Sequence, residues 1–134
     1  MANGVQVTFD CSDPGKLAAF WASALGYVIQ PPPEGFESWP AFLTSIGVPE
    51  SAWNSRSACV DPDGRGPRLF FQQVPEGKAA KNRVHLDVDV GRDRVAAEVE
   101  RLVGEGATRV GEHDEMGSQW VVMADPEGNE FCLQ

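Results

Sequence analysis

Basic residues are scarce in this sequence. Lysine and arginine total 11, against 20 aspartates and glutamates, so the formal net charge is -9. A field of this sign repels the phosphate backbone of nucleic acids and the surface of anionic membranes. We therefore expect neither nucleic acid nor a membrane as a partner. A cationic small molecule suits this charge better than an anionic polymer does.

Cysteines and long apolar runs are also few. The three cysteines, Cys11, Cys59 and Cys132, are odd in number, and no CxxC pair occurs. This usage is typical of reduced, buried thiols in a cytoplasmic protein. No apolar run approaches the roughly eighteen residues of a membrane span. The opening residues MANGVQVTFD lack the basic and apolar regions of an export signal, so we expect a cytoplasmic protein.

The first half of the chain alternates in a way that predicts strands around one helix. Val5 to Cys11 alternates apolar and polar residues, which indicates a half-buried strand. Asp13 and Pro14 then provide an N-cap and a first helical residue, and Gly26 ends the helix. Three further strands are expected at Tyr27 to Gln30, Ser57 to Val60 and Arg68 to Val74, the last two separated by the turn Asp61-Pro62-Asp63-Gly64.

The second half repeats this order. A strand is expected at Arg83 to Val90 and a helix at about Asp93 to Val103. Strands follow near Thr108 to Glu112, Gln119 to Met123 and Glu130 to Leu133, with Asp125-Pro126-Glu127-Gly128 as the matching turn. The halves are therefore two βαβββ modules, at about 4–75 and 82–134. Because three strands follow each helix, we predict an α+β fold with two curved mixed sheets around a cleft, rather than a doubly wound sheet.

Three stretches carry a family resemblance: FDCSDPGKLAAFWASALGY opens module one, KNRVHLDVDV opens module two, and WVVMADPEGNEFCLQ closes it. In this order and spacing the chain resembles the vicinal oxygen chelate superfamily, which includes glyoxalase, bleomycin-resistance and dioxygenase proteins, and more closely its glyoxalase-like branch. The resemblance covers nearly all of residues 1–134. It implies one glyoxalase-like domain whose cleft is lined by one face of each sheet.

Strand parity predicts which side chains line that cleft, because successive side chains of a strand point to opposite faces. The opposite faces should form the core under the helices, with residues such as Phe9, Phe71 and Phe131. The expected cleft residues are Gln6, Thr8, Asp10, Phe70, Gln72, His85, Asp87, Asp89, Glu130 and Cys132.

The resemblance implies a divalent metal held by a His or Glu on each opening strand and a Glu on the closing strands. Here those positions fall on Gln6, His85, Cys132 and, in module one, either Phe70 or Gln72. Only His85 is a good ligand, so we assign no metal ligand and expect that the usual metal has been lost. The main interpretation of Cys132 is a small residue that fills the cleft wall. A soft zinc or copper site with His85 and Cys132, and a reactive thiol, are the alternatives.

His85 and Asp87 are the candidate catalytic residues. An imidazole is the side chain that titrates nearest to neutral pH, so His85 is a candidate hydrogen-bonding or acid–base group. Asp10, Asp87 and Asp89 add carboxylates to the same face, where a pair at strand spacing can serve in acid–base chemistry. The alternative is that His85 is a cleft histidine bonded to a neighbouring carboxylate, and that the aspartates are solvated strand residues or turn caps.

The segment from Gln30 to Arg56 is too long for a hairpin turn, and its many Pro, Gly and aromatic residues suggest a lid. A short helix at Trp39 to Ile46, capped by Ser38, would place Trp39 and Phe42 over the cleft mouth. These aromatic residues would otherwise pack between the modules. Trp120 also has two interpretations: it lines the cleft wall, or it contacts a second copy of the chain in a dimer.

Two functions follow from these residues. One is a metal-free protein that binds a flat, aromatic or cationic small molecule, as bleomycin-resistance relatives do. The other is a glyoxalase-like lyase, isomerase or dioxygenase acting in the same cleft. A third interpretation is an accessory domain that binds another protein. The superfamily analogy, together with four Trp and seven Phe, also predicts a homodimer.

Overall fold

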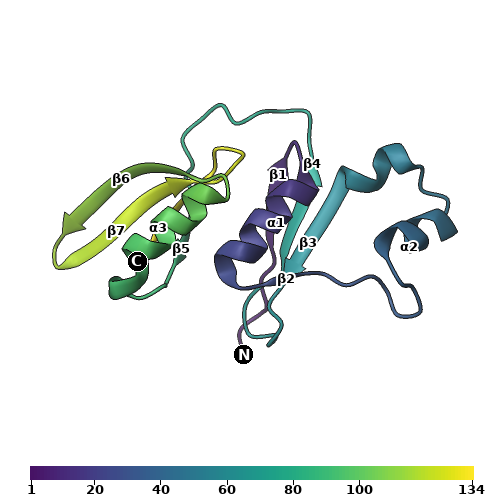
Figure 1. The fold of residues 1–134 in the computed structure, drawn as a ribbon, viewed down its shortest axis with the longest axis horizontal. Coiled ribbons are helices and arrows are strands. Elements are labelled where there is room, and N and C mark those ends of the chain that lie inside the picture. The colour runs from purple at the N-terminus through teal and green to yellow at the C-terminus, as the bar shows by residue number, and fades with distance from the viewer. The chain divides into compact units, whose positions relative to one another are not determined.

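A computed structural model describes all residues from 1 to 134, and the chain divides into two compact units. Unit one comprises Met1–Gly77 and unit two comprises Lys78–Gln134. Each unit contains one four-stranded mixed sheet with a helix packed on it (Figure 1). The α+β class, with two mixed sheets, is therefore confirmed.

Unit one has the strand order β1-β4-β3-β2. Strands β1 and β4 are parallel, whereas the β4–β3 and β3–β2 pairs are antiparallel. An insertion of two short helices separates β2 from β3 and extends away from the sheet (Figure 1). The elements are β1 (Val7–Cys11), α1 (Pro14–Leu25), β2 (Val28–Ile29), α2 (Trp39–Ser45), the 3₁₀ helix η1 (Glu50–Ser55), β3 (Arg56–Val60) and β4 (Leu69–Gln73).

The ends of α1 are set by the residues that the sequence indicated. The carboxylate of Asp13 accepts a hydrogen bond from the Lys16 backbone N–H at 3.2 Å, and Pro14 is the first helical residue. Gly26 ends the helix with a left-handed φ of 70°. The buried face of α1 packs on β3 and β4 through Leu17, Ala18, Phe20, Trp21 and Ala24.

Unit two repeats the topology with the strand order β5-β8-β7-β6. Its first pair, β5 with β8, is again parallel, and the other two pairs are antiparallel. The helix α3 contacts β6, β7 and β8, with Val99 and Leu102 buried. The elements are β5 (Leu86–Val88), the 3₁₀ helix η2 (Arg92–Arg94), α3 (Val95–Gly104), β6 (Thr108–Glu115), β7 (Ser118–Ala124) and β8 (Glu130–Leu133).

The two predicted turns have the same internal hydrogen bonds. The Asp61 carboxylate accepts the N–H groups of Asp63 at 2.8 Å and Arg65 at 3.1 Å. The Asp125 carboxylate accepts those of Glu127 and Asn129 at 2.9 and 3.0 Å. The bonds in the first turn hold the pKa of Asp61 below its usual value.

Strand register identifies the equivalent positions of the two units. When Gln6 to Cys11 is laid on His85 to Val90, Thr8 corresponds to Asp87. Phe70 is paired with Thr8 on β1, and Cys132 is paired with Asp87 on β5. Phe70 is therefore the counterpart of Cys132, which decides between Phe70 and Gln72 as the equivalent position. One hydrogen bond is repeated as well: Gln72 Nε2 donates to Asp10 Oδ1 at 2.7 Å, and Gln134 Nε2 donates to Asp89 Oδ1 at 2.9 Å.

Several element boundaries differ from those predicted. Strand β5 covers Leu86–Val88 rather than Arg83 to Val90, because the ladder with β8 pairs only these residues. Helix α3 begins at Val95 because Arg92–Arg94 form a 3₁₀ turn. Helix α2 ends at Ser45, one residue earlier than expected. None of the helices combines the length and apolar character that a membrane-spanning segment requires.

Candidate functional site

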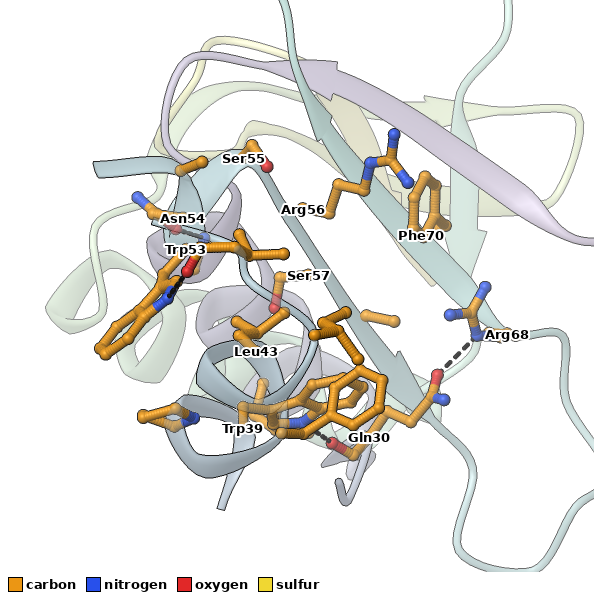
Figure 2. A pocket seen from close by; sticks show the side chains of 18 residues that line it. Gln30, Trp39, Leu43, Trp53, Asn54, Ser55, Arg56, Ser57, Arg68 and Phe70 are labelled. Carbon is orange, nitrogen blue, oxygen red and sulfur yellow. Dashed lines mark hydrogen bonds between the residues drawn. The ribbon is translucent and has the colours of Figure 1, made fainter. Parts of the chain in front are cut away.

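A cavity of about 750 Å³ lies in unit one, between the insertion and the sheet. Aromatic and aliphatic side chains of α2 form one side, and residues of β3 and β4 form another (Figure 2). Three of the predicted ligand-binding residues, Trp39, Phe42 and Phe70, line it. The structure thus brings these three residues together within a single unit.

Helix α2 holds its aromatic residues in place through its own capping and ring contacts. The Ser38 hydroxyl accepts the Ala41 backbone N–H at 3.2 Å. The Trp39 indole N–H donates to the Gln30 carbonyl at 2.7 Å, which ties the helix to the segment after β2. The Phe42 ring contacts Trp39 edge-on, with ring centroids 5.9 Å apart. The part of the segment that was predicted as a lid therefore has defined partners within unit one.

The 3₁₀ helix η1 is attached to the start of α1 by Asn54. Its side-chain oxygen accepts the Gly15 N–H at 2.8 Å, and its amide donates to Asp13 at 2.8 Å. The second bond is the main reason why the pKa of Asp13 lies below its usual value. Trp53 donates its indole N–H to the Val48 carbonyl at 3.1 Å. These contacts fix the second wall of the cavity.

Arg68 lies at the sheet side of the cavity. Its Nε donates to Gln30 Oε1 at 2.7 Å and its Nη1 to Gln6 Oε1 at 2.8 Å. The guanidinium carbon lies 5.2 Å from the centroid of the Phe70 ring. The predicted ligand residue Gln6 does not line the cavity, but it holds an arginine that does.

The other predicted residues of unit one lie on the same sheet face outside the cavity wall. Thr8 is exposed beside Phe70, and its hydroxyl accepts a hydrogen bond from Gln6 Nε2 at 3.4 Å. Asp10 and Gln72 are bonded to each other and exposed. This surface continues from the cavity along β1 and offers further polar groups.

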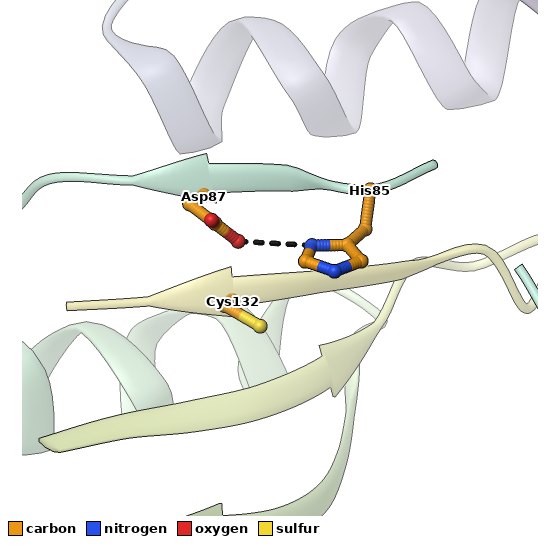
Figure 3. Close-up of side chains that lie close together, drawn as sticks. All are labelled: His85, Asp87 and Cys132. Carbon is orange, nitrogen blue, oxygen red and sulfur yellow. Dashed lines mark hydrogen bonds and ion pairs between the residues drawn. The ribbon is translucent and has the colours of Figure 1, made fainter. Parts of the chain in front are cut away.

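A second cluster lies in unit two, where His85, Asp87 and Cys132 come together (Figure 3). His85 and Asp87 belong to one strand segment and Cys132 to the neighbouring strand β8. The ring Nδ1 of His85 lies 2.9 Å from Asp87 Oδ1. The possible ligand atoms of all three residues lie within 4.8 Å of one another. Gln6 belongs to unit one, so its placement in the same cleft stays a prediction.

The electrostatics of this cluster keep the thiol protonated. Burial, followed by the negative charge of Asp87, raises the pKa of the Cys132 thiol to about 11. Cys132 is 7% exposed, whereas the side chains of His85 and Asp87 are 44% and 46% exposed. A salt bridge with Lys81 at 2.7 Å lowers the pKa of the neighbouring Glu130. A protonated thiol is a weak nucleophile.

The three side chains offer one nitrogen, one oxygen and one sulfur donor to a metal ion. This set suits a soft or borderline ion such as Zn²⁺, which accepts imidazole, carboxylate and thiolate ligands. Hard ions such as Mn²⁺ favour oxygen donors, so the thiol suits them poorly. Zinc binding would also have to displace the thiol proton. The set therefore fits zinc better than it fits a hard ion.

Trp120 lies elsewhere on the sheet of unit two. It is on the same face as Cys132, because Val122, two residues further along β7, is paired with Cys132. Its ring stacks on that of His113, with centroids 5.4 Å apart and an angle of 15° between the planes.

Sequence reasoning missed several cavity residues. Arg68 lies two residues before Phe70, so strand parity places it on the same face and could have identified it. Arg56 shows no motif that marks it as a site residue. Gln30, Trp53 and Asn54 had no local signal, because their contacts depend on how the insertion folds back.

Comparisons with known proteins agree with this fold. The family model described as "Glyoxalase-like domain" matches residues 6–134. No curated protein sequence matches the chain. Among solved structures, a mutant of the fosfomycin resistance protein FosX from Listeria monocytogenes, complexed with Mn(II) and 1S,2S-dihydroxypropylphosphonic acid, has a TM-score of 0.68 at 13% identity. That match covers 100% of this chain and 90% of FosX.

Two other structures are similar in fold. A glyoxalase/bleomycin resistance protein/dioxygenase family enzyme from Burkholderia phytofirmans PsJN has a TM-score of 0.66 at 18% identity, covering 98% of this chain and 97% of that one. The hypothetical protein SA1046 from S. aureus has a TM-score of 0.64 at 16% identity, covering 99% and 96%. From the family match and the repeated βαβββ units, the chain belongs to the family of proteins with a glyoxalase-like domain.

Proposed function

We propose that the protein binds an organic small molecule in the cavity of unit one. The observation that carries this proposal is the cavity itself, about 750 Å³ in volume and walled by aromatic and aliphatic side chains with a few polar groups. Cavities of roughly 300–1,000 Å³ with this composition are typical of ligand sites. Trp39, Phe42 and Phe70 provide rings against which a flat molecule can pack.

Binding at this cavity does not depend on a metal. None of its lining residues is a His, Cys, Asp or Glu. Support for a small molecule as the ligand class also comes from the FosX structure, whose ligand is a small phosphonic acid. A binding protein is therefore the function that the cavity supports best.

A screen of small organic molecules by thermal shift tests the proposal. A ligand at about 100 times its dissociation constant stabilises the folded state by about 2.7 kcal/mol. Leu43→Trp places a larger side chain at the cavity wall and should abolish the shift. Val103→Trp is the control, because Val103 is exposed on helix α3 in unit two. A ligand whose binding survives Leu43→Trp and is lost in His85→Ala would place the site elsewhere.

The second candidate function is an enzyme that uses His85, and the 2.9 Å contact between His85 Nδ1 and Asp87 favours it. The carboxylate orients the ring, and Nε2 is the ring nitrogen that would accept or donate a proton. Protonated Cys132 beside them would serve as a packing residue. Bound Zn²⁺ would supply a Lewis acid at the same place.

Metal analysis of the purified protein separates the two functions. One equivalent of zinc, lost in His85→Ala and in Cys132→Ser, would favour the enzyme. Zinc retained in both variants would show that these side chains do not hold it.

We also propose that the protein is a homodimer. Superfamily members often complete their clefts with neighbouring modules. Several apolar side chains are exposed in this chain, among them Val5, Val84 and Val110. An interface between two copies would cover such groups.

A further inference from the structure

We propose that the ligand of the unit-one cavity is an amphipathic organic anion. Its carboxylate would pair with Arg68, with Arg56 as a second cation at the same wall, and its aromatic or branched part would contact Trp39, Phe42 and Leu43. The inference rests on the proposed function and adds the chemical class of the ligand. It departs from the cationic ligand that the net charge of the chain suggests.

The charge of the cavity wall is opposite to that of the whole chain. Two of the lining residues are charged, and both are arginines. The formal net charge of the chain is -9. The carboxylates that were expected to attract a cation do not line the cavity: Asp10 lies on β1 outside it, and Asp87 lies in unit two. Local charge decides recognition over a few ångströms, because salt screens interactions beyond roughly 8 Å.

Arg68 is held in position without losing its charge. Its two hydrogen bonds, of 2.7 and 2.8 Å, go to the neutral amide oxygens of Gln30 and Gln6. No ion pair with a carboxylate compensates it. A guanidinium that is fixed by amides keeps other N–H groups for a carboxylate, and the pairing needs little reorganisation.

The second arginine lies across the same aromatic ring. Figure 2 shows the Phe70 ring between the side chains of Arg56 and Arg68. Arg56 is on β3, where it is paired with Gln72, and Ala58 on the same strand is paired with Phe70. The two arginines therefore lie on either side of the Ala58–Phe70 pair, which lines the cavity on its sheet side.

The opposite wall of the cavity is apolar. Leu43, Ile46 and Phe42 of the insertion line it together with Trp39 and Trp53. The indole N–H groups of both tryptophans already donate to backbone carbonyls, of Gln30 and Val48. Their rings therefore present apolar surface, and one end of a ligand meets cations while the other meets hydrocarbon.

Matched ligands test the inference by isothermal titration calorimetry. The probes are phenylacetate, indole-3-acetate and 2-naphthylacetate, each with its primary amide and with the arylethylamine of the same skeleton. At least one carboxylate should bind about tenfold or more tightly than its amide and its amine, because a charge-assisted pair with arginine is lost in both. In Arg68→Gln the affinity for that carboxylate should fall about tenfold, with the amide unchanged.

Further variants separate charge from folding. Arg68→Lys should retain part of the preference for the carboxylate. If Arg68→Gln fails to fold, Arg56→Gln is the substitute test, and it should reduce the same preference. Arg65→Gln is the control, because Arg65 is exposed in the Asp61 turn and does not line the cavity. Amides or amines that bind as tightly as the carboxylates would overturn the inference and leave the proposed function standing. If no probe binds and the thermal-shift screen finds no ligand, both are wrong.

Discussion

Cys132 occupies the position at which metal-binding members of the superfamily are expected to have a glutamate. Its counterpart in unit one is Phe70, so neither closing strand carries a carboxylate at this position. The residue at this position has different surroundings in the two units. In unit one it places a ring beside Arg68 at the cavity. In unit two it places a thiol beside His85 and Asp87.

Two buried thiols predict a loss of stability in alkali. Burial raises the pKa of Cys59 and of Cys132 from 9.0 to about 11. The folded state holds the neutral thiols, whereas the unfolded chain ionises above pH 9. Their contribution is therefore complete below pH 9 and is lost as the pH rises to about 11, by about 2–3 kcal/mol for a fully buried thiol. Urea unfolding from about pH 8 to about pH 11 should show this fall, and a Cys59→Ala variant should show a shallower one. Equal slopes would contradict the assignment.

Gly15 is needed for space rather than for backbone freedom. A Cβ at this position would lie 2.8 Å from the Asn54 side-chain oxygen, which accepts the Gly15 N–H. Gly15→Ala should therefore weaken the attachment of η1 and offset the gain in helix propensity, which is up to about 1 kcal/mol. Gly104→Ala in α3 is the matched control, because nothing lies within 4 Å there. Chemical denaturation should show stabilisation for Gly104→Ala and none for Gly15→Ala. Hydrogen exchange of the η1 amides should also be faster in Gly15→Ala.

At the scale of elements, the insertion between β2 and β3 is the feature that distinguishes unit one. Helix α2 has seven residues, none of them buried. A helix of this length is unstable by itself in water. It depends on the Ser38 cap, the Trp39 bond to Gln30 and the ring contacts of Phe42. The cavity wall is thus the least stable part of the candidate site.

Removal of the Ser38 cap should therefore reduce ligand binding more than it reduces global stability. Ser38→Ala takes one hydrogen bond from the first turn of α2, worth about 1 kcal/mol. The expected result is faster proteolysis within residues 38–46 and a higher dissociation constant for a cavity ligand. Thr44→Ala, on an exposed position of the same helix, serves as control. If both variants bind the ligand equally well, α2 does not form a necessary wall.

The elements themselves were largely predictable, for local reasons. Asp13, Pro14 and Gly26 define α1, and the Asp61 and Asp125 turns are fixed by bonds within a few residues. Strand parity correctly separated exposed Thr8 and Asp87 from buried Phe71 and Phe131. Such features depend on neighbours in the chain, which a sequence displays directly.

The cavity was not predictable in the same way. Parity assigns a residue to a face of the sheet, but it does not tell which part of the face the insertion covers. Phe70 also lies two residues further from its turn than Cys132 does, so the repeat alone left the register of β4 open. The decisive contacts, Trp39 with Gln30 and Arg68 with Gln6, join residues that only the folded chain brings together.

At the scale of the whole molecule, the internal repeat gives each unit its own sheet, helix and core. Unit one carries the cavity, and unit two carries the His85 cluster. The repeat thus keeps the same topology while the two copies differ in chemistry. A protein that binds an organic anion in one unit can keep the His85 cluster of the other for a separate role.

The last prediction concerns assembly at this scale. If two copies associate, sedimentation equilibrium at micromolar concentration should give twice the chain mass of 14.5 kDa. Exposed apolar residues such as Val84 and Val110 are the places to test, because a charge at an interface is costly to bury. Val110→Lys or Val84→Lys should then shift the mass toward that of one chain, whereas Val103→Lys on the helix α3 provides a comparison on a different surface. A mass of 14.5 kDa for the unaltered protein would show that it is a monomer, and the cavity and its ligand would then be properties of a single chain.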